Sequence, residues 1–170
     1  MKEYRIKQRF WSIGGKFEIT DQYGAVNYYV TGSFMKIPKQ FIITDSFGNR
    51  VSTITKVIFQ FLPKFDVSLA NGQNFRIKKD FTFFKSRYQI DGLGLSVKGD
   101  WWNMNFSLLE GNKKVASISQ KWFKLTSTYD IQVYDEKYSD VVISLVIAID
   151  YVKEQEASSR SASSSSNSGN

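Results

Sequence analysis

The chain of 170 residues is long enough for one domain with a substantial core and too short for two. It contains no cysteine and no histidine, which excludes disulfides, zinc–thiolate sites and the histidine-based triads of common hydrolases. Its net charge of +7 favours anionic partners such as phospholipid headgroups or nucleic acid, although the same charge also serves plain solubility.

The first ten residues, MKEYRIKQRF, lack the apolar stretch of a secretory signal. A chain without cysteine also suits a reducing compartment. We therefore expect a cytoplasmic protein. Its hydrophobic content of 42% and aromatic content of 16% predict a packed globular fold.

Three segments near the N-terminus repeat at a spacing that places Phe17, Phe41 and Phe65 in equivalent positions. Each alternates apolar and polar residues with a period of two and is followed by a turn and a second β-rich run. The repeat unit is therefore a β-hairpin, and weaker copies predict roughly ten to twelve antiparallel strands in a sandwich or barrel. We interpret Asp21 and Asp45 as turn residues rather than catalytic acids.

The densest group of cations lies within the sequence RIKKDFTFFKSR, residues 76–87. These cations are a candidate site for an anionic headgroup, and the alternative is a solvated strand face beside core phenylalanines. Lys79 has the parity of the apolar residues, so either a bulge turns it outward or its ammonium extends to solvent at a barrel rim. The cationic cluster consists of Arg76, Lys78, Lys79, Lys85 and Arg87.

Trp101 and Trp102 are adjacent, and adjacent side chains of a strand point to opposite faces. One tryptophan of the pair is therefore a candidate exposed aromatic, suited to a membrane interface or a stacked base, but we favour the alternative in which loops bury both. A second, looser lysine group is interpreted as solvated surface; it consists of Lys113, Lys114, Lys121 and Lys124. No motif predicts a metal site, a cofactor or a catalytic residue.

Residues 141–149, VVISLVIAI, are apolar at eight of nine positions without strand or helix periodicity. As a strand of an antiparallel sheet, the segment would expose about half of these side chains to solvent. A helix enclosed by a closed or curled sheet buries all of them. The low helix propensity of the β-branched residues destabilises the helix by about 2–3 kcal/mol. Burial of the additional aliphatic side chains stabilises it by about 6–12 kcal/mol. We therefore expect a buried helix that begins near Ser139 or Asp140, with a side-chain cap, and ends near Val152.

Such a helix is too short to cross a membrane, because nine residues rise about 14 Å against a hydrocarbon core of about 30 Å. Beyond it, the last fourteen residues contain eight serines. We expect one domain over residues 1–153 and a disordered Ser-rich tail over residues 154–170.

The order of these motifs resembles the LURP-one-related (LOR) family, in particular its small bacterial members, over about residues 2–153. The resemblance implies the fold of tubby C-terminal and phospholipid scramblase domains, a closed antiparallel β-barrel of about twelve strands around a hydrophobic C-terminal helix. Tubby domains bind phosphoinositide headgroups and scramblases act at membranes, so a lipid connection follows by analogy, without a catalytic residue to transfer. The motifs include SIGGKFEITDQYG (12–24), FIITDSFGN (41–49), FTFFKSRYQIDG (81–92), GDWW (99–102) and VVISLVIAIDYV (141–152).

Together these observations predict a non-enzymatic module that binds anionic phospholipid headgroups, or another acidic surface, through the cationic cluster at the inner face of the membrane. A single-stranded nucleic-acid or protein-binding module is the alternative. An enzyme that uses Asp, Lys or Tyr in the barrel mouth is the least favoured reading. The sequence leaves the ligand and the oligomeric state open.

Overall fold

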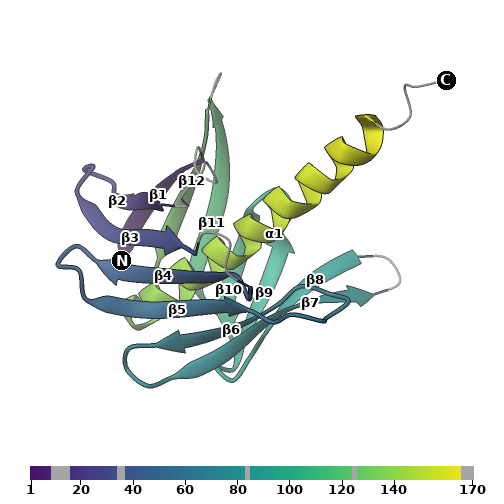
Figure 1. Cartoon of the computed structure of the whole chain (residues 1–170). Helices are drawn as coiled ribbons and strands as arrows, with labels where there is room; N and C mark the ends of the chain where they lie inside the picture. The colour runs from purple at the N-terminus through teal and green to yellow at the C-terminus, as the bar shows by residue number, and fades with distance from the viewer. Residues whose placement is uncertain (9–15, 34–36, 83–84, 124–125, 166–170) are drawn as a thin grey trace.

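The computed structural model describes residues 1–8, 16–33, 37–82, 85–123 and 126–165, and residues 7–8, 81–82, 85–87, 122–123, 126–127 and 161–165 by their backbone alone. Twelve antiparallel strands form a closed barrel in which β1 pairs with both β2 and β12 (Figure 1). The mainly β fold expected from the sequence is therefore confirmed. The strands are β1 (Lys2–Gln8), β2 (Lys16–Asp21), β3 (Val26–Gly32), β4 (Gln40–Asp45), β5 (Arg50–Lys56), β6 (Lys64–Leu69), β7 (Asn74–Thr82), β8 (Lys85–Asp91), β9 (Leu95–Asp100), β10 (Asn105–Glu110), β11 (Lys113–Phe123) and β12 (Thr126–Val133).

The helix α1 (Ser139–Ser165) follows a short 3-10 helix, η1 (Glu136–Tyr138), and passes through the barrel (Figure 1). Every residue from 141 to 149 is at most 2% exposed, which confirms that this apolar segment is surrounded on all sides. The only polar residue among them, Ser144, shares a hydrogen bond of 2.8 Å with Ser52 of β5. The barrel therefore supplies both the apolar contacts and the hydroxyl partner that the segment needs.

Both ends of α1 differ in part from the sequence-based expectation. The helix begins at Ser139 as predicted, but the Ser139 hydroxyl has no hydrogen-bond partner among the described residues, and the Asp140 carboxylate instead accepts a hydrogen bond of 3.0 Å from Tyr28. The predicted end near Val152 is wrong, because the helix continues to Ser165 in place of the disordered tail expected from residue 154.

The residues of α1 beyond Val152 are helical although few of them are buried. A helix that is already nucleated gains one residue at little further cost, so polar residues prolong it without having to be buried. Side-chain contacts with the barrel also hold this part of α1: Lys153 donates a hydrogen bond of 3.0 Å to Gln120, and Glu156 forms an ion pair with Lys79.

The 24-residue repeat corresponds to consecutive strand pairs. Phe17, Phe41 and Phe65 lie near the starts of β2, β4 and β6, and all three are buried inside the barrel. The carboxylates that end two of these strands hold the following turns. Asp21 accepts the backbone N–H groups of residues 23 and 25, and Asp45 accepts those of Phe47 and Asn49 at 2.9 and 2.8 Å. The interpretation of both aspartates as turn residues is confirmed.

The antiparallel order gives the barrel two different ends. The turn end contains the short connections 22–25, 46–49, 70–73, 92–94 and 111–112, and α1 begins there. The helix-exit end contains residues 37–39 and the connections 57–63 and 101–104, and the C-terminal part of α1 leaves the barrel there (Figure 1). The two ends therefore present different side chains to solvent.

Candidate functional site

The outward-facing members of the cationic cluster are paired with carboxylates of neighbouring strands. Arg76 lies opposite Asp66 in the β6–β7 register, and its Nε is 2.6 Å from the carboxylate; Lys78 of β7 is 2.9 Å from Asp91 of β8. The hydrogen bonds and the negative charges of these carboxylates raise the pKa of both cations. These two residues therefore present neutralised pairs, not free positive charge, to an anionic ligand.

Lys79 lies inside the barrel. Its side chain is 5% exposed, its ammonium is paired with Glu156 of α1, and the Nζ atom is 4.9 Å from the centroid of the Trp101 ring. Neither an outward turn of this residue nor an ammonium extending to solvent is found. Lys79 instead joins the barrel wall to α1, because a buried cation requires a charged partner.

The remaining two members of the cationic cluster, Lys85 and Arg87, belong to β8, where their backbones pair with Thr82 and Asp80. Their side chains lie outside the described residues. The cluster is thus brought to one hairpin, β7–β8, and each of its three described side chains has a carboxylate partner.

The two adjacent tryptophans lie in the tight turn 101–104, not in a strand. Trp101 is 7% exposed, and Trp102 is half-buried against it at a ring distance of 5.5 Å, so of the two candidates only Trp102 is partly accessible to solvent. Gly99, with φ of +126°, permits the close approach of β10, since an added Cβ atom would be 2.7 Å from the Asn105 carbonyl oxygen. The strand alternation ends there, which removes the basis of the prediction.

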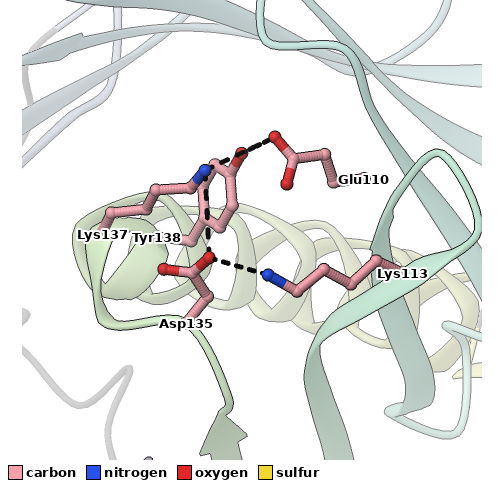
Figure 2. A network of polar contacts seen from close by, with 5 residues as sticks. All are labelled: Glu110, Lys113, Asp135, Lys137 and Tyr138. Atoms are coloured by element: carbon pink, nitrogen blue, oxygen red, sulfur yellow. Dashed lines mark hydrogen bonds and ion pairs between the residues drawn. The ribbon is translucent and has the colours of Figure 1, made fainter.

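The second lysine group is divided between separate ion pairs. Lys113 is 3.3 Å from Asp135, which also lies 3.8 Å from Lys137, while Lys137 and the Tyr138 hydroxyl both approach Glu110 (Figure 2). Lys121 is paired with Asp130, Lys114 is exposed, and the Lys124 side chain lies outside the described residues. The network in Figure 2 holds η1 against the β10–β11 turn and is structural.

Three lysines that no sequence motif singles out lie at the helix-exit end, and we call them the lysine collar: Lys39, Lys56 and Lys64. The Lys56 backbone N–H donates a hydrogen bond of 2.9 Å to the Lys39 carbonyl, so the first two are neighbours across β4 and β5. Their Nζ atoms lie 5.6 and 5.5 Å from the ring centroids of Phe41 and Tyr151. No described carboxylate forms an ion pair with any of the three.

Apolar side chains project beside this collar. Ile37, Phe59 and Phe61 are 85%, 96% and 98% exposed, and Phe59 has the left-handed φ of 59° that bulky residues rarely adopt. With the less exposed Ile58 they form what we call the apolar rim. A hollow of about 570 Å³ adjoins it and is lined in part by Ile37, Lys39, Lys56 and Tyr151.

Sequence reasoning missed the apolar rim for a specific reason. The segment VIFQFLPK, residues 57–64, places Phe59 and Phe61 two residues apart, as in a strand with a buried face. This spacing is typical of a hairpin strand, so the local pattern alone does not distinguish a strand from a projecting loop. The length of the connection, seven residues instead of a tight turn, and Pro63 at its end were the signals that favoured a projecting loop.

A closed twelve-stranded antiparallel barrel filled by an apolar C-terminal helix defines the structural class of this protein. The chain belongs to the LURP-one-related family, whose profile matches residues 2–150. Within the described part of the chain, no helix combines the length and the apolar character needed to cross a bilayer.

One relative is the uncharacterized protein YxjI of Bacillus subtilis (strain 168). It is 30% identical over 149 residues, which cover 88% of this chain and 91% of YxjI. The X-ray structure of the Arabidopsis thaliana protein AT5G01750 resembles this fold with a TM-score of 0.58 at 16% identity, covering 88% of this chain and 91% of that one. At this identity the likeness concerns the fold alone.

Proposed function

We propose that the barrel is a non-enzymatic module that binds an anionic phospholipid surface through the lysine collar, as a peripheral protein at the inner face of the membrane. The proposal rests chiefly on the difference between two groups of cations. Arg76, Lys78 and Lys79 have carboxylate partners, whereas the collar lysines have none among the described residues. A phosphate that approaches the collar therefore displaces no internal ion pair.

The size of this electrostatic attraction sets the expected strength of binding. Each cation held near an acidic leaflet contributes about 1 kcal/mol, so three collar lysines supply roughly 3 kcal/mol. This is weak, and it decreases with salt because the attraction extends only about one Debye length, roughly 8–10 Å, from the surface. Charge alone therefore supports reversible docking on acidic membranes and little binding to neutral ones.

The polar groups inside the barrel support a structural role. Tyr28 and Tyr129 have pKa values raised by burial and donate hydrogen bonds to Asp140 and Asp150 of α1, which tie the helix to the wall. Three other carboxylates have lowered pKa values because turn or neighbouring groups donate hydrogen bonds to them: Asp45, Asp100 and Glu110. Among the described residues, no cluster of three His, Cys, Asp or Glu side chains offers a metal site.

Sedimentation with lipid vesicles tests the proposal. We expect the protein to pellet with vesicles containing phosphatidylserine and to remain in the supernatant with phosphatidylcholine alone. The double variant K56E/K64E should lose most of this binding. The variant K98E/K114E changes the net charge equally at exposed lysines away from the collar, and it should bind as the wild type does.

Two outcomes would contradict the proposal: equal binding to acidic and neutral vesicles, or equal losses in the two double variants. A single-stranded oligonucleotide added in competition separates the main alternative. The ligand is nucleic acid if the protein binds the oligonucleotide tightly and does not bind the vesicles. The affinity for the oligonucleotide should then fall steeply as the salt concentration rises.

A further inference from the structure

The helix-exit end combines positive charge with apolar side chains that do not pack on the protein's own core. Phe59 and Phe61 are almost fully exposed on the connection 57–63, and Ile37 projects from residues 37–39, the described part of the neighbouring connection. The Lys56–Lys39 backbone hydrogen bond joins the two connections at their bases. The apolar rim is thus one continuous feature that is held by the barrel wall.

We infer that Phe59 and Phe61, together with Ile37, insert into the bilayer below the headgroups while the lysine collar remains at the level of the phosphates. This inference rests on the proposed binding to anionic phospholipid and specifies its geometry. Aromatic side chains gain free energy by leaving water for the acyl boundary, and a peripheral protein held by weak charge alone needs such a second contribution.

The charges around the apolar rim favour a bilayer over a second copy of this chain. Two copies that met rim to rim would bring two lysine collars together without described carboxylates to compensate them, and like charges brought together oppose association. An anionic leaflet presents the opposite charge to the collar and an apolar layer to the phenylalanines. Both kinds of side chain therefore find suitable partners in the same surface.

The turn end provides an internal comparison. Phe47 is 89% exposed there, which is close to the exposure of Phe59, but its neighbour Asp45 is an acid with a lowered pKa. The exposed cation Arg50 flanks the same turn, so the charges of Asp45 and Arg50 cancel and an acidic leaflet has no net attraction to this position, whereas it attracts the collar. Phe47 serves as a control with matched side chain and exposure but without a surplus of positive charge beside it.

The polar part of α1 limits the orientation of the docked barrel. Residues 153–160 leave the barrel at the same end, where Glu156 pairs with Lys79 and Arg160 lies 4.9 Å from the Trp102 ring. Gln155 and Ser159 line a hollow that they share with Lys56 and Pro63. Polar side chains do not enter hydrocarbon. The barrel must therefore dock with residues 37–39 and 57–63 nearest to the membrane and with the polar part of α1 outside the hydrocarbon.

Site-specific labelling tests the insertion directly, and the absence of cysteine from the chain makes single labels unambiguous. We propose the variants F59C, F61C and F47C, each carrying an environment-sensitive NBD fluorophore. Acidic vesicles should shift the emission of the labels at 59 and 61 to the blue, and nitroxides on the acyl chains should quench them. The label at 47 should not respond.

The possible results separate the inference from the proposal beneath it. If the labelled proteins sediment with acidic vesicles while the labels at 59 and 61 remain in water, insertion is wrong and anionic-surface binding stands. If unlabelled wild-type protein does not sediment at low salt, the proposed function fails and the inference fails with it. If those labels are shielded without lipid and the particle mass doubles, a second copy covers the rim and the inference is overturned.

A functional measurement complements the labels. F61S should weaken binding to acidic vesicles about tenfold, the lower end expected when a phenylalanine is no longer transferred out of water, and F47S should leave it unchanged. Because both positions are exposed, neither change disturbs the core. Equal affinities of F61S and the wild type would overturn the inference.

Discussion

The described side chains of the cationic cluster form ion pairs with carboxylates, whereas the collar lysines form none with the described carboxylates. Arg76 and Asp66 are ten residues apart in the chain, and the β6–β7 register brings them together. The sequence shows the cations of the cluster within twelve consecutive residues, but it does not contain the strand register that pairs them with carboxylates. The collar lysines come from three separate segments of the chain, so no local sequence pattern predicts that they lie together.

The turn aspartates lead to a prediction about pH. The Asn49 side chain, followed by the backbone N–H groups of Asn49 and Phe47, holds the pKa of Asp45 below its usual value. A folded-state pKa below the unfolded value of about 4 means that the carboxylate stabilises the fold above that pH and ceases to do so as the pH falls through the folded value. D45A should therefore lower the urea midpoint at neutral pH, and the difference from the wild type should shrink in acid.

Urea unfolding at neutral and acidic pH checks this prediction, with S46A as a control at the neighbouring exposed position. We expect S46A to match the wild type throughout. A difference between D45A and the wild type that stays constant on acidification would show that the ionised carboxylate is not the source of the stability.

At the scale of elements, the strands were predictable because each hairpin repeats the same alternation around Phe17, Phe41 and Phe65. The start of α1 and its burial were predictable because residues 141–149 have no polar face. The position where α1 ends and the projection of the connection 57–63 were not predictable from the sequence. Helix propagation and loop projection depend on neighbouring elements, and the local period of apolar residues does not reveal them.

The enclosed helix predicts a large effect of a cavity. Leu145 is fully buried between α1 and the barrel wall, so L145A should lower the free energy of unfolding by about 2–5 kcal/mol. Q155A, at an exposed position on the same helix, should change it by less than about 0.5 kcal/mol. Chemical denaturation followed by circular dichroism measures both. A loss below about 1 kcal/mol for L145A would contradict the complete enclosure of this segment.

At the scale of the whole molecule, the barrel has two chemically different ends. Short turns held by Asp21 and Asp45 lie at one end, and the lysine collar with the apolar rim lies at the other. The antiparallel order brings alternate connections to the same end, but which lysines and apolar side chains gather there depends on the loops and on α1, so the site could not be deduced from consecutive sequence. The fold and its family were predictable from the order of the motifs, whereas the candidate site required the structure.

Hydrogen exchange measured by mass spectrometry, with and without vesicles containing phosphatidylserine, tests most directly whether the helix-exit end is the docking surface. We predict that vesicles slow exchange in peptides covering the connection 57–63 and residues 37–40, and leave the turns 22–25 and 46–49 unchanged. Slower exchange at those turns, or along the β7–β8 hairpin without any change at 57–63, would contradict the account.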